Sequence, residues 1–113
     1  IKNINNSMVE FKNLKIDKNW FLVLVNAVFN NKNIIDASLS NFLESDWSLE
    51  RMDPTLTNIL RCAFIEFKNY SNIPTKVVIN EYTNIASSFF NKPEVSFVNG
   101  VLDKVSHKYR SEN

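Results

Sequence analysis

One aromatic residue and several lysines in the last part of the chain could contact single-stranded nucleic acid. Phe97, Lys104 and Lys108 are spaced so that they fall on one side of a helix, and Lys76 at the start of the preceding segment could add a phosphate contact. An unpaired base can stack on an aromatic ring while nearby cations neutralise its phosphates. The alternative is that Phe97 packs against a neighbouring helix and that the lysines are simply hydrated.

A single carboxylate is expected inside the protein. Glu66 shares the apolar side of its predicted helix with Ile59 and Ala63. Because a lone buried carboxylate is costly, we expect hydrogen bonds to compensate it. The free N–H groups that open a helix at Thr75 are the predicted donors, and the helix dipole also favours an anion there. This structural role is preferred to a catalytic one.

Four more residues inside predicted helices are interpreted as structural, and they are Asn80, Glu81, Asn99 and Gly100. Glycine in a helix interior costs about 1 kcal/mol relative to alanine, so Gly100 needs a reason. Close approach of another helix backbone is the simplest one. Asn99 would bridge helices, although a ligand contact is the alternative. Arg61 flanks the apolar side of its helix and could form an ion pair or bind phosphate.

The residue types that usually carry catalysis or bind metals form no recognisable set. His107 is the only histidine and is expected at the surface. Cys62 is the only cysteine, and its apolar helical surroundings favour a buried thiol over a nucleophile. A single cysteine forms no internal disulfide, which suits a reducing cytoplasm. We therefore expect no enzyme activity, no cofactor and no bound metal.

The composition is that of one folded domain. Of the 113 residues, 44% are hydrophobic and 22% charged, which favours a globular core over disorder. The net charge is only +1, so the protein as a whole does not have a strongly positive electrostatic potential. Any nucleic-acid binding must therefore come from a local patch of positive charge. No apolar run approaches the roughly 20 residues that a membrane helix needs.

Helices are predicted to position these residues, because the chain has one Gly and three Pro and its apolar residues recur with helical spacing. The clearest start is Asp53 as N-cap followed by Pro54. Short connections between the helices imply an antiparallel bundle, and the fold class is therefore all-α. The predicted segments are 7–14, which is weak, then 17–30, 34–43, 54–69, 75–90 and 94–109, with 44–51 as a connection.

Three stretches of the sequence resemble the NusB family. The first is Trp47-x-Leu49-x-Arg51-Met52 leading to Ile59–Phe67, the second is Ile73–Glu81, and the third is Phe97–Lys104. They are similar to the family patterns I-L-R-x-A-x-x-E-L, I-P-x-x-V-x-I-N-E and F-V-N-G-V-L-D. All three occur in the expected order and at the expected spacing.

The resemblance implies a single NusB-like helical domain over residues 1–113, with about five to six helices in two small helical subdomains. It implies a bacterial transcription antitermination factor that binds boxA-type single-stranded RNA together with NusE, a small-subunit ribosomal protein. Other Nus factors and RNA polymerase would be indirect partners, and ribosomal RNA transcription would be supported. Candidate contacts for NusE are Glu50, Arg51 and Leu56, on the exposed side of 47–56.

The sequence departs from the family pattern in two places. The family's Arg-rich first helix, usually A-R-x-x-A-x-x-x-L-Y, supplies part of the RNA contact and has no counterpart here. The chain starts at Ile1 and is expected to be a fragment. Phe90-Asn91-Lys92-Pro93 replaces the usual Gly-containing acidic turn.

Two alternative functions remain open. A NusB-like domain also precedes the catalytic domain of some ribosomal RNA cytosine methyltransferases, where it is an accessory RNA-binding module. Such a chain would continue past Arg110, and an end at Asn113 is what we expect of a free-standing factor. The other alternative is a protein-interaction scaffold that no longer binds RNA.

Overall fold

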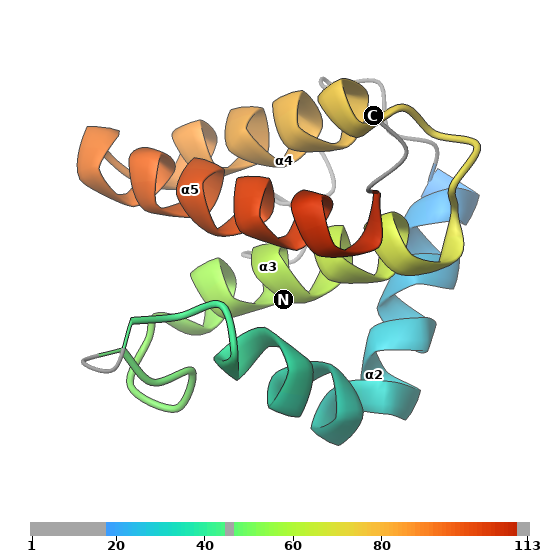
Figure 1. Ribbon diagram of the computed structural model, residues 1–113, viewed down its shortest axis with the longest axis horizontal. Coiled ribbons are helices and arrows are strands. Elements are labelled where there is room, and N and C mark those ends of the chain that lie inside the picture. Colours follow the sequence, from blue (N-terminus) through green and yellow to red (C-terminus); the bar gives the residue numbers. More distant parts are fainter. Residues whose placement is uncertain (1–17, 45–46, 111–113) are drawn as a thin grey trace.

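The structure, a computed structural model, describes residues 18–44 and 47–110, with side chains described from residue 22. In these residues the secondary structure is entirely helical (Figure 1), which confirms the all-α class. The helices are α2 (Lys18–Ser40), α3 (Pro54–Asn69), α4 (Thr75–Phe89) and α5 (Lys92–Tyr109). The predicted segment 7–14 lies outside the described residues, and the division into two subdomains stays a prediction.

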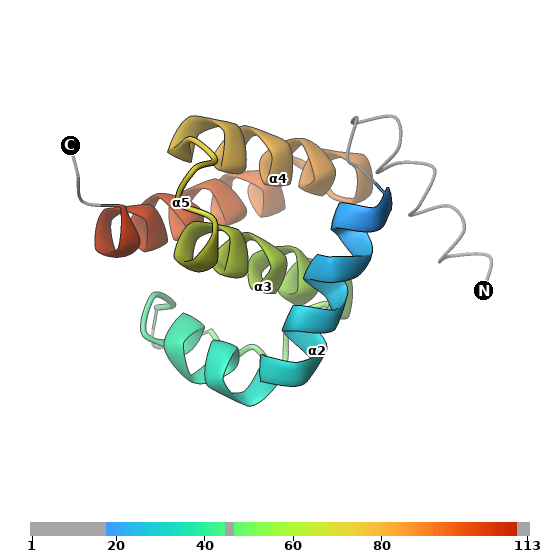
Figure 2. The ribbon, with the colours of Figure 1, turned by 90° about the vertical axis from the view of Figure 1, so that its right-hand side faces the viewer.

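α3 is the central helix and contacts each of the other three. α4 and α5 form an antiparallel pair on one side of it, and α2 packs on the other side (Figures 1 and 2). A short connection joins α4 to α5, so these two helices return along each other as the short linkers predicted. Four candidates for RNA binding lie on the α4–α5 pair, namely Lys76, Phe97, Lys104 and Lys108.

The interruption predicted after Asn30 is present as a kink inside α2. Residues 17–30 and 34–43 were expected to be separate helices, and α2 consists of two helical segments that meet at non-helical dihedrals at Asn31 (φ −121°, ψ 18°). The Asn31 side-chain amide donates a hydrogen bond to the Ala27 carbonyl, at 2.8 Å. Because this amide occupies a carbonyl of the preceding turn, the helix bends without ending. The two segments are counted together as the one helix α2.

Two helix starts illustrate how local chemistry sets the boundaries. Asp53 caps α3, as predicted, by accepting a hydrogen bond from the Thr55 N–H at 2.8 Å. α5 begins at Lys92, earlier than the expected Glu94, because Pro93 fits the first turn, where no N–H is needed. The Asn91 N–H donates to the Glu94 carboxylate at 3.2 Å, one half of a capping box.

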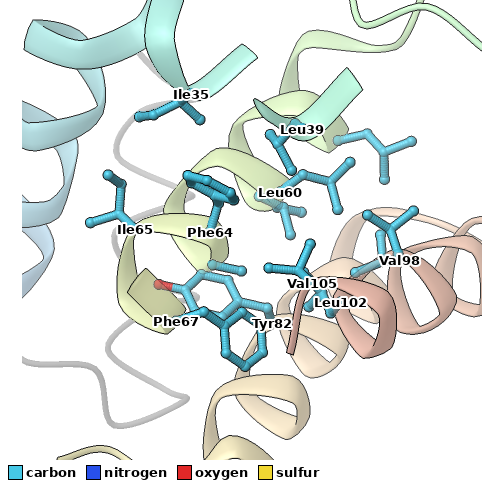
Figure 3. Packing of buried hydrophobic residues seen from close by; sticks show 14 of the residues in the cluster. Ile35, Leu39, Leu60, Phe64, Ile65, Phe67, Tyr82, Val98, Leu102 and Val105 are labelled. Atoms are coloured by element: carbon cyan, nitrogen blue, oxygen red, sulfur yellow. The ribbon is translucent and has the colours of Figure 1, made fainter. Parts of the chain in front are cut away.

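The buried side chains of all four helices make one continuous hydrophobic cluster (Figure 3). α3 supplies the largest share, and it inserts Phe64 and Phe67 between its neighbours. Fully buried residues contributed by the other helices are Leu24, Ile35, Leu39, Val78, Ile85, Val98, Leu102 and Val105. This cluster is the rigid support on which the surface of α5 rests.

Arg110, which the sequence pattern did not single out, ties the end of α5 to the end of α3. Its guanidinium donates to the carbonyls of Phe67 (2.9 Å), Tyr70 (2.9 Å), Glu66 (3.2 Å) and Ile73 (2.7 Å). It also lies over the Phe67 ring, 5.5 Å from its centroid. The last carbonyls of a helix have no partner within it, so Arg110 satisfies several of them at once.

Candidate nucleic-acid interface

Phe97 lies near the start of α5 and is half-buried. Its ring contacts the indole of Trp47, with centroids 4.6 Å apart and planes inclined by 31°. Trp47 belongs to the connection between α2 and α3, so Phe97 packs on a loop rather than only on a neighbouring helix. Trp47 remains 48% exposed. An aromatic pair therefore reaches the surface at this end of α5.

Lysines continue this side of α5. Lys104 is exposed, and its Nζ lies 3.8 Å from a carboxylate oxygen of Glu44, which is itself exposed. An ion pair between such solvated groups contributes at most about 1 kcal/mol, so Lys104 can exchange its partner for a phosphate at little cost. Lys108 is exposed one turn further on. Phe97, Lys104 and Lys108 thus share one side of the helix, as their spacing predicted.

Lys76 lies at the opposite end of the α4–α5 pair from Phe97. It is exposed in the first turn of α4, and α4 begins where α5 ends. Arg110, just after α5, reaches the Thr75 hydroxyl at 3.4 Å. A phosphate bound by Lys76 would therefore lie at the Lys108 end of the helix pair, about 15–18 Å along α5 from Phe97.

The residues predicted to contact a protein partner separate into two groups. Glu50 and Arg51 are exposed on the connection that also carries Trp47. Leu56 is only 5% exposed and packs in the hydrophobic core with Ile59, so its assignment to a contact surface is wrong. The physical reason is helical spacing. Leu56 lies one turn before Ile59 and therefore faces the same, apolar side of α3.

Glu66 is buried, as predicted, but its partner differs from the prediction. The hydroxyl of Tyr82 donates a hydrogen bond to the Glu66 carboxylate. Tyr82 lies two turns into α4, not at its first N–H groups. Burial raises the pKa of Glu66 above its usual 4.5, and the Tyr82 hydrogen bond opposes that rise. Burial also raises the pKa of Tyr82 well above 10, so this hydroxyl keeps its proton and donates.

Cys62 and Glu81 lie near this pair. Burial raises the pKa of the Cys62 thiol to about 12, with a smaller contribution from the Glu66 charge and an opposing one from Arg61. A thiol with such a pKa is not a nucleophile at neutral pH. Glu81 is half-buried, and burial raises its pKa as well. The cluster of Cys62, Glu66, Glu81 and Tyr82 is suited to packing and not to catalysis.

Asn80, Asn99 and Gly100 are exposed, and the close helix approach expected at Gly100 is wrong. A Cβ placed on Gly100 would meet nothing within 4 Å, so no helix backbone approaches it closely. Asn99 lies beside it on the outer part of α5 and not in a bridge between helices. Helical spacing alone did not reveal this, because both residues border the apolar side of the helix.

Arg61 forms the ion pair that the sequence suggested. Its guanidinium donates hydrogen bonds to both carboxylate oxygens of Asp36, at 2.7 and 2.8 Å. It also donates to the Asn58 side chain at 2.8 Å. The pair joins the second half of α2 to α3, in the bidentate geometry that arginine favours. Arg61 is therefore structural and not a phosphate ligand.

His107 is exposed on α5. Across residues 18–44 and 47–110, no group of three or more His, Cys, Asp or Glu residues could hold a metal ion. None of the helices in this part of the chain is both long and apolar enough to span a bilayer.

Comparison with known proteins identifies the family. The model of the NusB family matches residues 1–107. The transcription antitermination protein NusB of Caulobacter vibrioides is 43% identical over 94 residues, covering 83% of this chain and 63% of that protein. The protein of the same name from Bartonella tribocorum is 40% identical over 97 residues, covering 86% and 62%. This chain thus spans less than two thirds of the length of these relatives.

A solved structure of T. maritima NusB has the same fold. It superposes with a TM-score of 0.73 at 31% sequence identity, covering 84% of this chain and 68% of that one.

Proposed function

This chain belongs to the NusB family, and we propose that it is a transcription antitermination factor that binds boxA-type single-stranded RNA together with NusE in the bacterial cytoplasm. The relatives named above are transcription antitermination proteins. RNA polymerase and other Nus factors would be reached through this complex. Ribosomal RNA operons would be the transcripts served.

The observation that supports binding of single-stranded RNA is the exposed side of α5. It presents the Trp47-supported ring of Phe97 and, two and three turns later, the cations of Lys104 and Lys108. An aromatic ring and cations on one rigid helix are what an unpaired base and its phosphates require. With a net charge of only +1, binding would depend on this local arrangement more than on long-range attraction.

For NusE, we propose the connection between α2 and α3, at Glu50 and Arg51. Leu49 and Met52 are buried on either side of these two residues, so the connection is anchored while Glu50 and Arg51 remain exposed. The Thr57 hydroxyl on α3 donates to the Leu49 carbonyl at 3.5 Å and so further holds the connection to α3. The proposed partner surface therefore borders the proposed RNA surface at Trp47.

The test is fluorescence anisotropy of a labelled boxA-like single-stranded RNA against a scrambled RNA, with and without NusE, at several salt concentrations. We expect NusE to strengthen binding of the boxA-like RNA more than of the scrambled one. Replacing Lys104 and Lys108 by Gln should reduce the salt dependence of log K by about 0.7 per lost phosphate contact. Lys32→Gln with Lys68→Gln, two exposed lysines elsewhere, is the matched control.

The outcome that contradicts the proposal is equal, weak binding of both RNAs in the presence of NusE. If NusE still binds in that case, the protein acts as a scaffold and not as an RNA-binding factor. If neither binds, family membership accounts for the fold alone.

A further inference from the structure

We infer that Trp47 is a second RNA-contacting residue, which forms with Phe97 a two-ring platform for an unpaired base beside Lys104. This inference rests on the proposed function and adds to it a residue outside the three helical motifs. It assigns a chemical class of ligand, the face of a nucleobase, to a side chain of the connection between α2 and α3.

The geometry of the pair supports this role. The two ring centroids are 4.6 Å apart and the planes differ by 31°, which is closer to offset stacking than to an edge-to-face contact. Phe97 is half-buried and packs against the hydrophobic core. Trp47 keeps 48% of its surface exposed, so about half of this residue is open to a ligand.

The indole is held in place although it lies on a connection. Its backbone N–H donates to the Glu44 carbonyl at 2.9 Å, and the Glu44 carboxylate pairs with Lys104 at 3.8 Å. The buried Leu49 then fixes the chain on the other side. Figure 1 shows this connection at the same end of the molecule as the start of α5. A preorganised ring loses little freedom when a base stacks on it.

The surroundings favour a nucleic acid over an apolar protein surface. In the described part of the chain, the other large exposed hydrophobic residues lie on α2 and α4, not on this connection. Apart from Phe97, the residues tied to Trp47 are charged: Glu44 accepts a hydrogen bond from its N–H and pairs with Lys104. Glu50 and Arg51 follow it in the sequence. A protein interface of useful affinity needs a larger desolvated centre, whereas a base needs only a ring face and a cation nearby.

A fluorescence titration tests the contact directly. The chain has two tryptophans, so Trp20→Phe leaves Trp47 as the only emitting indole. Stacking of a base on this indole should quench its emission when the boxA-like RNA is added in the presence of NusE. The midpoint should agree with the anisotropy titration of the same sample. NusE alone provides the baseline, and the scrambled RNA should quench less.

Substitutions test the energy of the contact. Trp47→Ala should weaken binding of the boxA-like RNA roughly tenfold, while Trp47→Phe should retain most of the affinity. Because the two rings act as one platform, Trp47→Ala with Phe97→Ala should weaken binding less than the product of the single effects. Phe89→Ala, which removes an exposed aromatic residue on α4, is the matched control and should leave RNA binding unchanged.

The outcomes separate this inference from the proposed function. If RNA binds but the Trp47 emission and the Trp47→Ala affinity do not change, the platform is wrong and the function stands. If Trp47→Ala weakens NusE binding and not RNA binding, the residue belongs to the protein interface. If no RNA binds with NusE present, both are wrong. Should Trp47→Ala melt early, the quenching titration still decides the matter, because it uses the intact Trp47.

Discussion

α3 and the first half of α2 use their apolar residues in opposite ways. On α3 the apolar residues fall on one broad side and are almost entirely buried between three neighbours. Among residues 22–30 of α2, Leu24 and Val28 are the buried apolar side chains, while Leu22, Val25 and Phe29 form a second stripe that is exposed. Figure 2 shows how this first half of α2 crosses the end of α3. Phe29 is 80% exposed. A helical spacing of apolar residues therefore does not by itself say that they are covered.

The difference should appear most strongly in stability. Phe64→Ala removes a fully buried ring from the centre of the core, and we expect it to lower the free energy of unfolding by about 3–5 kcal/mol. Phe29→Ala should change it by less than about 0.5 kcal/mol, since the ring is already solvated. Urea denaturation followed by circular dichroism measures both. A large loss for Phe29→Ala would mean that another part of the protein covers this side of α2.

Arg110→Ala tests whether the α3–α5 side depends on its polar tie as well as on its core. The substitution removes the Arg110 donor from the carbonyls of Phe67 and Ile73, while those of Glu66 and Tyr70 keep backbone donors. We expect a loss of about 3 kcal/mol. Arg110→Lys should recover only part of it, because an ammonium lacks the planar fork. Hydrogen exchange at the α3–α4 turn should accelerate in both variants. Unchanged exchange would show that the turn is held by packing alone.

Glu66→Gln tests the buried carboxylate of α3 through its pH dependence. Burial raises its pKa in the folded protein above 4.5, so its stabilisation is complete below the unfolded-state value and is lost as the pH rises through the folded-state value. Glutamine keeps an acceptor for Tyr82 without a charge. The variant should therefore gain stability relative to the wild type as the pH increases from 4 to 7, in melts across that range.

Glu66→Ala is the control for this titration. It removes the acceptor altogether and should be destabilised by a few kcal/mol or less at every pH. A constant difference between Glu66→Gln and the wild type over the pH range would contradict a shifted carboxyl.

Gly100→Ala has the smallest expected effect and the opposite sign. The position is helical and exposed, and an added Cβ meets nothing within 4 Å. Alanine should therefore stabilise α5 by about 1 kcal/mol through its helix propensity, as a rise of the melting temperature. Asn99→Ala, the adjacent exposed position, provides a comparison. A destabilised Gly100→Ala would mean that the backbone at Gly100 is not free.

Much of the fold followed from local sequence. The caps at Asp53 and Pro54, the spacing of the α3 residues and the short turns predicted an antiparallel helical bundle, because each depends on contacts within a few residues. The spacing of Phe97, Lys104 and Lys108 likewise placed these side chains on one side of a helix. The three motifs also indicated the family, since their residue types and order are properties of the chain itself.

Tertiary structure decided which of these side chains meet. The donor to Glu66 is Tyr82 and not the start of α4. Arg110 donates to carbonyls at the end of α3, and the ring of Trp47 contacts that of Phe97. These partners are separated by 16 to 50 positions in the sequence, and a periodic pattern gives the side of a helix but not its rotation against a distant neighbour. Gly100 turned outward for the same reason. Such choices depend on how the whole core packs at once, which no local stretch of sequence encodes.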